Sequence, residues 1–245
     1  MTLLKSTATH IGTRETNQDR IFAEISQLVS APNQLGPLGL FCVADGMGGL
    51  EEGEYAASVA AETIKGWWDK GLQHPFNPLG RPVKGAEVLD AFFSLFGSIN
   101  DTIRGRPREG DRRYGTTCSV LLIQGNRYYI AHAGDSRIYK IGKGWFARGR
   151  QLTVDHTHPE RGTLTSCLGG FERPRIFTCS GEIDKPCTFL LCSDGLHKAV
   201  KDKEIAAVAK RSKDSGILAD TLVNRALKQD ASDNVSVITV KLQKG

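Results

Sequence analysis

The sequence lacks any apolar stretch near the roughly 18 residues that a membrane-spanning helix requires. Its first ten residues, M-T-L-L-K-S-T-A-T-H, lack the long apolar core of a secretory signal. It also lacks internal repeats, coiled-coil heptads and low-complexity tracts. These absences predict a cytoplasmic protein that has no membrane partner.

Cysteine pairs with C-x-x-C spacing are also missing, which argues against a structural zinc site. A disulfide framework is not expected in a cytosolic chain of this length. The favoured interpretation is that the cysteines are reduced and act as small buried hydrophobic residues. His156 and His158, in D-H-T-H-P, have no cysteine or histidine cluster near them in sequence, so a structural role is favoured for both.

A strong charge of one sign is absent as well. The 32 Lys and Arg residues against 27 Asp and Glu give a net charge of +5, and no basic run is long enough to indicate nucleic-acid binding. The composition is that of an ordinary soluble protein. A chain of 245 residues is expected to form one domain over residues 1–245. With no evident exposed apolar patch, a monomer is the default expectation.

Acidic residues recur where predicted strands meet turns. The apolar run Leu40 to Ala44 indicates a buried strand, and it ends at Asp45 and Gly46. One such turn is common and decides nothing by itself. The arrangement returns at three distant positions: Asp135, Asp194 and Asp233.

Acids that pack together repel one another, and a multivalent cation relieves the repulsion. Oxygen-only ligands favour magnesium, manganese or calcium over zinc. The four aspartates therefore predict a site for a hard divalent cation, provided that the fold brings them together.

The order of the elements predicts the fold class. Apolar residues at three- and four-residue spacing indicate helices over residues 51–70, 86–103, 202–211 and 215–228. Strands are expected over residues 3–9, 20–25, 40–44, 116–123, 127–133, 137–141, 145–147, 176–179, 189–192 and 235–242. Runs of strands with helices in separate pairs favour an α+β fold. We predict a four-layer sandwich in which two central antiparallel β-sheets are flanked by pairs of α-helices.

Seven short motifs give the chain a resemblance to a known family. They are R-E-T-N-Q-D at 14–19, D-G-M-G-G at 45–49, G-T-T at 115–117, G-D-S-R at 134–137, L-T-V-D-H-T at 152–157, S-D-G-L at 193–196 and D-N-V-S at 233–236. Each is weak alone, but all seven stand in the order found in the metal-dependent protein phosphatases, the type 2C serine/threonine family. The sequence resembles a bacterial-type member of that family over nearly its whole length.

The resemblance implies an enzyme that hydrolyses phosphoserine and phosphothreonine by attack of a water activated between two Mn²⁺ or Mg²⁺ ions. It implies that Asp45 bridges the two ions and that the Gly46 carbonyl ligates one of them. The remaining assignments that it implies are Asp194 and Asp233 on the other ion, Asp19 bound through water, Asp135 with Asp194 at a possible third ion, and Arg14 on the substrate phosphate. With a metal-activated water no covalent phosphoenzyme is needed, so a cysteine nucleophile is not indicated.

Three departures from the family pattern stand out: Gln18 where many relatives carry glutamate, Met47 in place of a histidine, and a shortened flap between Asp155 and Cys167. We expect the short flap to leave a more open site. Substrate choice would then fall on other surfaces, such as the basic loop at 104–113.

Two functions fit the sequence. The first is an active phosphatase in signal transduction, acting on a phosphorylated protein made by a bacterial serine/threonine kinase. The second is a binding protein that keeps the fold without turnover. Retention of Asp45, Asp194 and Asp233 together favours the enzyme, because a binding module has no need of these acids.

Overall fold

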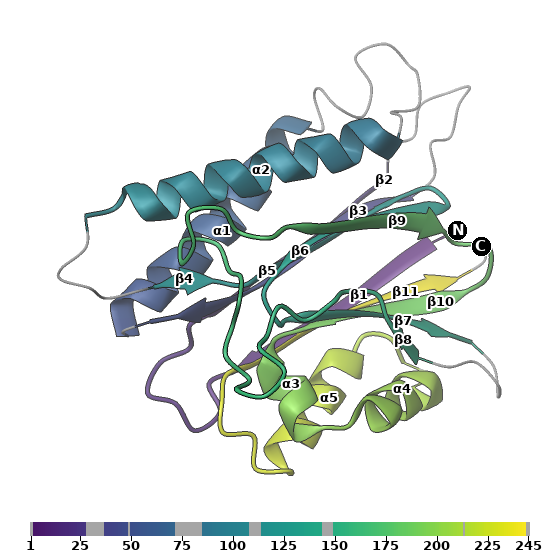
Figure 1. Cartoon of the computed structure of the whole chain (residues 1–245). Helices are drawn as coiled ribbons and strands as arrows, with labels where there is room; N and C mark the ends of the chain where they lie inside the picture. The colour runs from purple at the N-terminus through teal and green to yellow at the C-terminus, as the bar shows by residue number, and fades with distance from the viewer. Residues whose placement is uncertain are drawn as a thin grey trace.

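The chain folds into four layers, with two β-sheets inside and helices on both outer faces (Figure 1). The structure is a computed structural model, and it describes residues 2–27, 37–48, 50–71, 85–107, 114–143, 149–212 and 214–243. Within these ranges, no helix combines the length and the apolar character that crossing a membrane would require. The four layers confirm the predicted α+β sandwich.

The two sheets are antiparallel and lie face to face. The first contains, in spatial order, β2 (Asp19–Gln27), β3 (Pro37–Met47), β5 (Cys118–Gln124), β6 (Arg127–Ala133) and β9 (Phe177–Glu182), and the short β4 (Gly115–Thr116) pairs with β3. The second contains β1 (Thr2–His10), β11 (Val235–Gln243), β10 (Cys187–Cys192), β7 (Arg137–Gly142) and β8 (Gly149–Gln151). The first and last strands, β1 and β11, therefore pair with each other, with Thr2 opposite Gln243.

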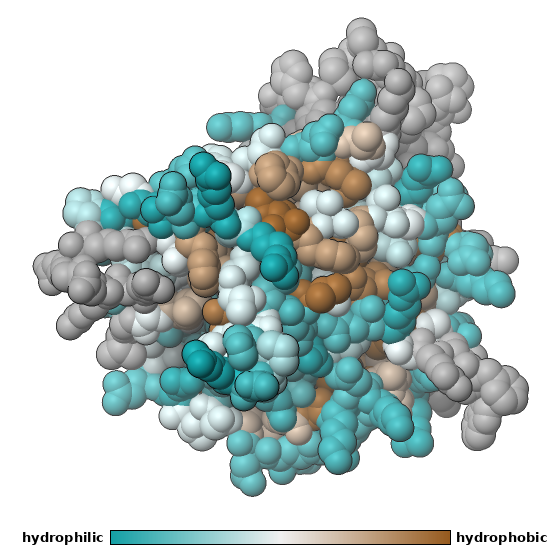
Figure 2. Space-filling model, in the orientation of Figure 1, coloured by the Kyte–Doolittle hydropathy of each residue, from teal (hydrophilic) through white to brown (hydrophobic). Residues whose placement is uncertain are grey.

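Two groups of helices cover the sheets. The first sheet is covered by α1 (Leu50–Gly71) and α2 (Gly85–Gly105). The second is covered by α3 (Asp194–Ala199), α4 (Asp202–Arg211) and α5 (Leu218–Leu227). On the face seen in Figure 2, hydrophilic side chains cover the lower helical layer, and hydrophobic surface is gathered between α2 and β9.

Strand β3 shows why the layers form. Its side chains alternate between two cores, because successive residues of a strand point to opposite faces. Leu40 and Cys42 pack toward the helices α1 and α2, whereas Phe41 and Val43 pack into the core between the sheets. A strand that is apolar on both faces is stable only when both faces are covered.

The predicted elements agree with the structure except at some ends. The helix 202–211 has the predicted bounds, whereas the helix expected over 215–228 begins only at Leu218. Helix α3 was not predicted. The strand expected at 145–147 and most of the basic loop at 104–113 lie outside the described residues. All six cysteines are free thiols, as expected.

Candidate active site

Five aspartates from separate segments meet at one end of the two sheets. Four of them line a pocket of about 280 Å³, and the fifth is buried beside them. Those at the pocket are Asp45, Asp135, Asp194 and Asp233, and the buried one is Asp19. The structure thus brings together all the aspartates that the sequence singled out.

Strand register accounts for the convergence. In the first sheet, Asp19 at the start of β2 stands opposite Asp45 in β3. In the second sheet, β10 ends beside the start of β11, so Asp194 and Asp233 come from neighbouring strand ends. Asp135 lies in the turn between β6 and β7, the connection that crosses from one sheet to the other.

The G-T-T motif fixes the backbone of Asp45. The Asp45 N–H donates to the Thr117 hydroxyl at 3.0 Å, and the Asp45 carbonyl accepts bonds from the Thr117 N–H at 2.9 Å and the Thr116 hydroxyl at 3.0 Å. The next residue is a glycine, Gly46, because the chain is crowded at that position. A Cβ on Gly46 would stand 2.2 Å from the Gly53 carbonyl oxygen, so a larger residue cannot fit without movement.

Asn234 anchors the loop that carries Arg14. Its side-chain oxygen accepts the Gln18 N–H at 2.9 Å, and its amide nitrogen donates to the carbonyls of Ile11 at 2.8 Å and Thr16 at 2.9 Å. These bonds span more than 200 positions of sequence. The D-N-V-S motif therefore supplies an acid to the pocket and holds the opposite wall in place.

Burial and mutual repulsion raise the pKa of three of the acids. Asp45 opens onto the pocket, but protein surrounds its other sides, and desolvation followed by the charges of Asp19 and Asp194 raises its pKa well above the usual range. Burial likewise raises the pKa of Asp19 to about 6 and the pKa of Asp135 to about 6. These acids are costly to ionise together unless a cation joins them.

Two side-chain cations stand at the pocket. Arg14 Nη2 donates to Asp233 Oδ2 at 2.6 Å, and its own side chain remains 58% exposed. The Lys198 ammonium forms an ion pair with Asp194 Oδ2. Burial lowers the pKa of Lys198, but the hydrogen bond and charge of Asp194 outweigh burial and raise it.

The donor set fits a hard cation. Among the described residues, Asp19 Oδ1 and Asp194 Oδ1 are buried side-chain oxygens without a hydrogen-bond partner. Buried polar atoms are otherwise nearly always paired, so two orphaned carboxylate oxygens beside other acids suit a cation as their partner. No three acidic, histidine or cysteine side chains in the described ranges form a ready-made ligand set. Because Oδ1 of Asp194 has no partner, a metal could bind there while Oδ2 stays paired with Lys198, whereas a metal at Asp233 Oδ2 would displace Arg14.

The departures from the family pattern also lie at the pocket. Gln18 and Met47 both line it. The shortened segment folds back on itself through a bridge between Thr157 and Leu164, and it brings Gly162 and Leu164 to the pocket wall. The expectation of a more open site stays a prediction. Gly49 of D-G-M-G-G lies outside the described residues.

Sequence reasoning missed Lys198. Its signal was the spacing to Asp194, because residues four apart share a helix face. That signal needs a helix starting at Asp194, and none was expected there. A larger cavity of about 690 Å³ lies at the far ends of β10 and β11, where Cys187 and Leu242 line it. The described residues that border it include no Asp or Glu, so it offers no comparable donor set.

These features define an acidic pocket at the end of a two-sheet sandwich, and the comparisons with known proteins place this fold in a family. A model of the family described as "Protein phosphatase 2C" matches residues 7–230. The chain therefore belongs to the protein phosphatase 2C family, and the prediction of a metal-dependent serine/threonine phosphatase is confirmed at the level of the family.

Several similar proteins come from bacteria. The serine/threonine phosphatase stp of Listeria innocua is 26% identical over 227 residues, covering 83% of this chain and 85% of that protein. PstP of Mycobacterium tuberculosis is 29% identical over 219 residues, covering 81% of this chain but 39% of that longer protein. The solved catalytic domain of PstP in complex with two manganese ions has a TM-score of 0.74, 26% identity and 99% coverage of both chains. PppA of Pseudomonas aeruginosa gives a TM-score of 0.73, 25% identity and 98% coverage of both.

Proposed function

We propose that this protein removes phosphate from phosphoserine and phosphothreonine of phosphoproteins with the help of two divalent ions, Mn²⁺ or Mg²⁺. The carrying observation is that five aspartates from distant segments meet at one pocket, where two buried carboxylate oxygens lack a partner among the described residues. The relative solved with two manganese ions supports the choice of metal. One catalytic domain over residues 1–245 is part of the proposal.

Each chain group has a definite task in this proposal. Asp45, with the Gly46 carbonyl, and the pair Asp194 and Asp233 hold the ions, and the buried Asp19 acts through water. When bound, such ions neutralise phosphate charge and lower the pKa of a water molecule. Asp135 lines the same pocket.

Arg14 is proposed to grip the substrate phosphate. Its guanidinium presents a planar fork that suits two phosphate oxygens. It is held by Asp233 yet more than half exposed, so it can reach a ligand that enters from solvent. Substrate binding would exchange the Asp233 carboxylate for the phosphate as the partner of Arg14.

A protein substrate is supported by the surface around Arg14. A second hollow of about 290 Å³ adjoins the acidic pocket and shares Arg14, Gln18 and Gly48 with it. Residues that flank a phosphoserine could lie there while the phosphate reaches the acids. We propose that the phosphoprotein is made by a bacterial serine/threonine kinase in the cytoplasm, and that the phosphatase acts as a monomer.

The test uses a small aryl phosphate and a phosphothreonine peptide, each with and without Mn²⁺. We expect hydrolysis of both to require the metal and to stop with a chelator. Asp45→Asn should lower kcat by at least about 100-fold, because the loss of one charge-stabilising group commonly has that effect. The matched control is Asp220→Asn, since Asp220 is exposed on α5 away from the pocket.

Binding without turnover would favour a binding protein over an enzyme. If the folded wild type binds phosphopeptide but turns over neither substrate at any Mn²⁺ or Mg²⁺ concentration, the proposal of catalysis is wrong. Arg14→Ala separates the two tasks further. It should raise KM for the phosphopeptide while Mn²⁺ binding persists, because Arg14 contacts phosphate and not metal in this scheme.

A further inference from the structure

Lys198 is a cation that lines the acidic pocket, with its side chain 60% exposed, and the function proposed above gives it no task. Of the described residues that line the pocket, Lys198 and Arg14 are the two cationic ones. They stand at different acids: Arg14 pairs with Asp233, and Lys198 pairs with Asp194. The ordinary interpretation of Lys198 is a helix-surface pair four residues apart, which contributes little to stability.

The surroundings of the pair differ from those of a surface pair. The Asp194 side chain is only 12% exposed, and its other oxygen is buried without a partner. The helix α3 is short, and it is fixed to the β6–β7 turn because His197 Nε2 donates to the Asp135 carbonyl at 3.0 Å. This bond brings Lys198 to the side of the pocket where Asp135 lies.

The charges of Lys198, Asp135 and Asp194 interact with one another. Burial raises the pKa of Asp135 and the charge of Asp194 raises it further, whereas the ammonium of Lys198 lowers it, so the three charged groups interact across the pocket. Two carboxylates and one ammonium carry a net charge of −1, compared with −2 for the carboxylates alone. The attraction for a divalent ion at this corner is reduced accordingly, and the ion would also meet the ammonium at close range.

We propose that the Lys198 ammonium takes the place of a third divalent cation at Asp135 and Asp194, so that the protein binds two such ions. The proposal rests on the proposed function above. It gives Asp135 a different role from that of a metal ligand in the wild type. Lys198 is then a positioning residue that acts through the two carboxylates.

The test measures the number of Mn²⁺ ions bound, by equilibrium dialysis with metal analysis and by titration of the free Mn²⁺ electron-spin-resonance signal. We expect two ions per chain for the wild type and a third, weaker ion for Lys198→Met. The methionine keeps much of the lysine's length and removes its charge. Lys198→Arg keeps the charge, so it should bind two ions.

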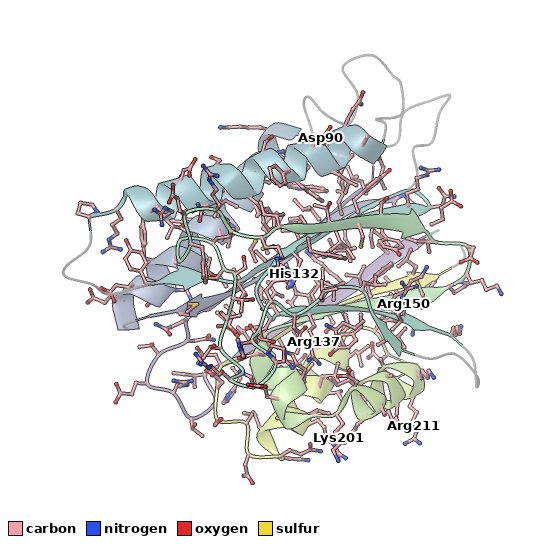
Figure 3. All side chains as sticks on the ribbon, viewed as in Figure 1. Asp90, His132, Arg137, Arg150, Lys201 and Arg211 are labelled. Atoms are coloured by element: carbon pink, nitrogen blue, oxygen red, sulfur yellow. The ribbon has the colours of Figure 1, made fainter. Side chains whose placement is uncertain are left out.

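Two controls identify the site. Lys201→Met removes an exposed lysine just before α4, outside the pocket (Figure 3), and should leave the count at two. Adding Asp135→Asn to Lys198→Met should weaken the third ion at least tenfold and leave the first two. Thermal unfolding with Mn²⁺ shows that each variant is folded before its ions are counted.

The outcomes separate this inference from the proposed function. Three ions in the wild type, or two in both the wild type and Lys198→Met, would overturn the role of Lys198 and leave the phosphatase intact. A third ion that persists with Asp135→Asn would also overturn it, because the ion would then lie elsewhere. A wild type that binds fewer than two ions would overturn the proposed function itself, and this inference with it.

Discussion

Replacement of His132 should change the way stability depends on pH. The side chain lies between the sheets (Figure 3), is fully buried, and packs against His156 with the ring centroids 5.1 Å apart. Burial, followed by the charge of His156, lowers the pKa of His132 from 6.5 to about 3. The ring is therefore neutral in the folded protein at pH 5, whereas the unfolded chain is protonated there.

The direction follows from proton binding. Between pH 6.5 and about 3 the unfolded state binds one proton more at this position, so the free energy of unfolding falls as the pH falls. One proton corresponds to about 1.4 kcal/mol per pH unit, or about 2–3 kcal/mol between pH 6 and pH 4. Above pH 7 this loss is absent.

Urea unfolding of the wild type and His132→Gln from pH 8 to pH 4, with chelator throughout, measures the effect. Glutamine can still donate to the Val154 carbonyl, which lies 3.2 Å from His132 Nε2. The variant should be less stable by about 1–2 kcal/mol at pH 8 through lost packing, and this difference should vanish or reverse by pH 4. His10→Gln changes an exposed histidine and keeps His132, so it should retain the acid loss. Parallel curves for the wild type and His132→Gln would refute the reasoning.

Three further predictions concern the pocket. Gly46→Ala should destabilise the protein by about 2–4 kcal/mol in urea unfolding, because the new Cβ would meet the Gly53 carbonyl. The control Gly66→Ala, on α1, has open space around the new methyl group and should stabilise the protein by about 0.5–1 kcal/mol. Asn234→Ala leaves three backbone groups without partners and should lower the free energy of unfolding by about 2–4 kcal/mol. It should also weaken Mn²⁺ binding measured by calorimetry, and an unchanged metal affinity would contradict the anchoring role of Asn234. In chelator, the raised pKa of Asp19 makes stability fall as the pH rises from 4 through about 6, and Asp19→Asn should remove about 2–3 kcal/mol of that loss in a pH series of melts.

Much of the fold follows from local patterns. The helix α4 could be placed because it presents one buried stripe, and the strand β11 because it is an apolar run that is buried on both faces. The convergence of the aspartates could be expected because each follows or precedes a buried strand. The resemblance then supplied which of them act together, which spacing alone leaves open.

The start of α5 shows what local patterns cannot give. The helix begins at Leu218, not at Ser215 as expected. Ser6, more than 200 positions away, accepts the Ala219 N–H at 3.3 Å and donates to the Gly216 carbonyl at 2.8 Å, so a residue of β1 fixes the first turn. No sequence window contains both partners of these bonds.

Helix α3 was missed for a related reason. It has six residues and a glycine near its start, which gives a weak propensity signal. Its stability comes from tertiary contacts: Leu196 is fully buried in the core below the second sheet, and His197 bonds to the Asp135 carbonyl. Without this helix the placement of Lys198 beside Asp194 could not be derived.

Uncharged groups hold Asp45 in place, whereas Asp233 and Asp194 pair with Arg14 and Lys198. Thr117 bonds to the Asp45 backbone and, at 2.7 Å, to the Ser136 hydroxyl, while Ser119 bonds to the neutral ring of His132 at 2.8 Å. Backbone groups, hydroxyls and an unprotonated imidazole can fix a strand end without neutralising its carboxylate. A layer of arginines would fix the same acids more strongly, but it would satisfy the charge that a metal must meet. Burial lowers the pKa of His132 to about 3, so its ring joins this hydrogen-bonded scaffold without adding a positive charge.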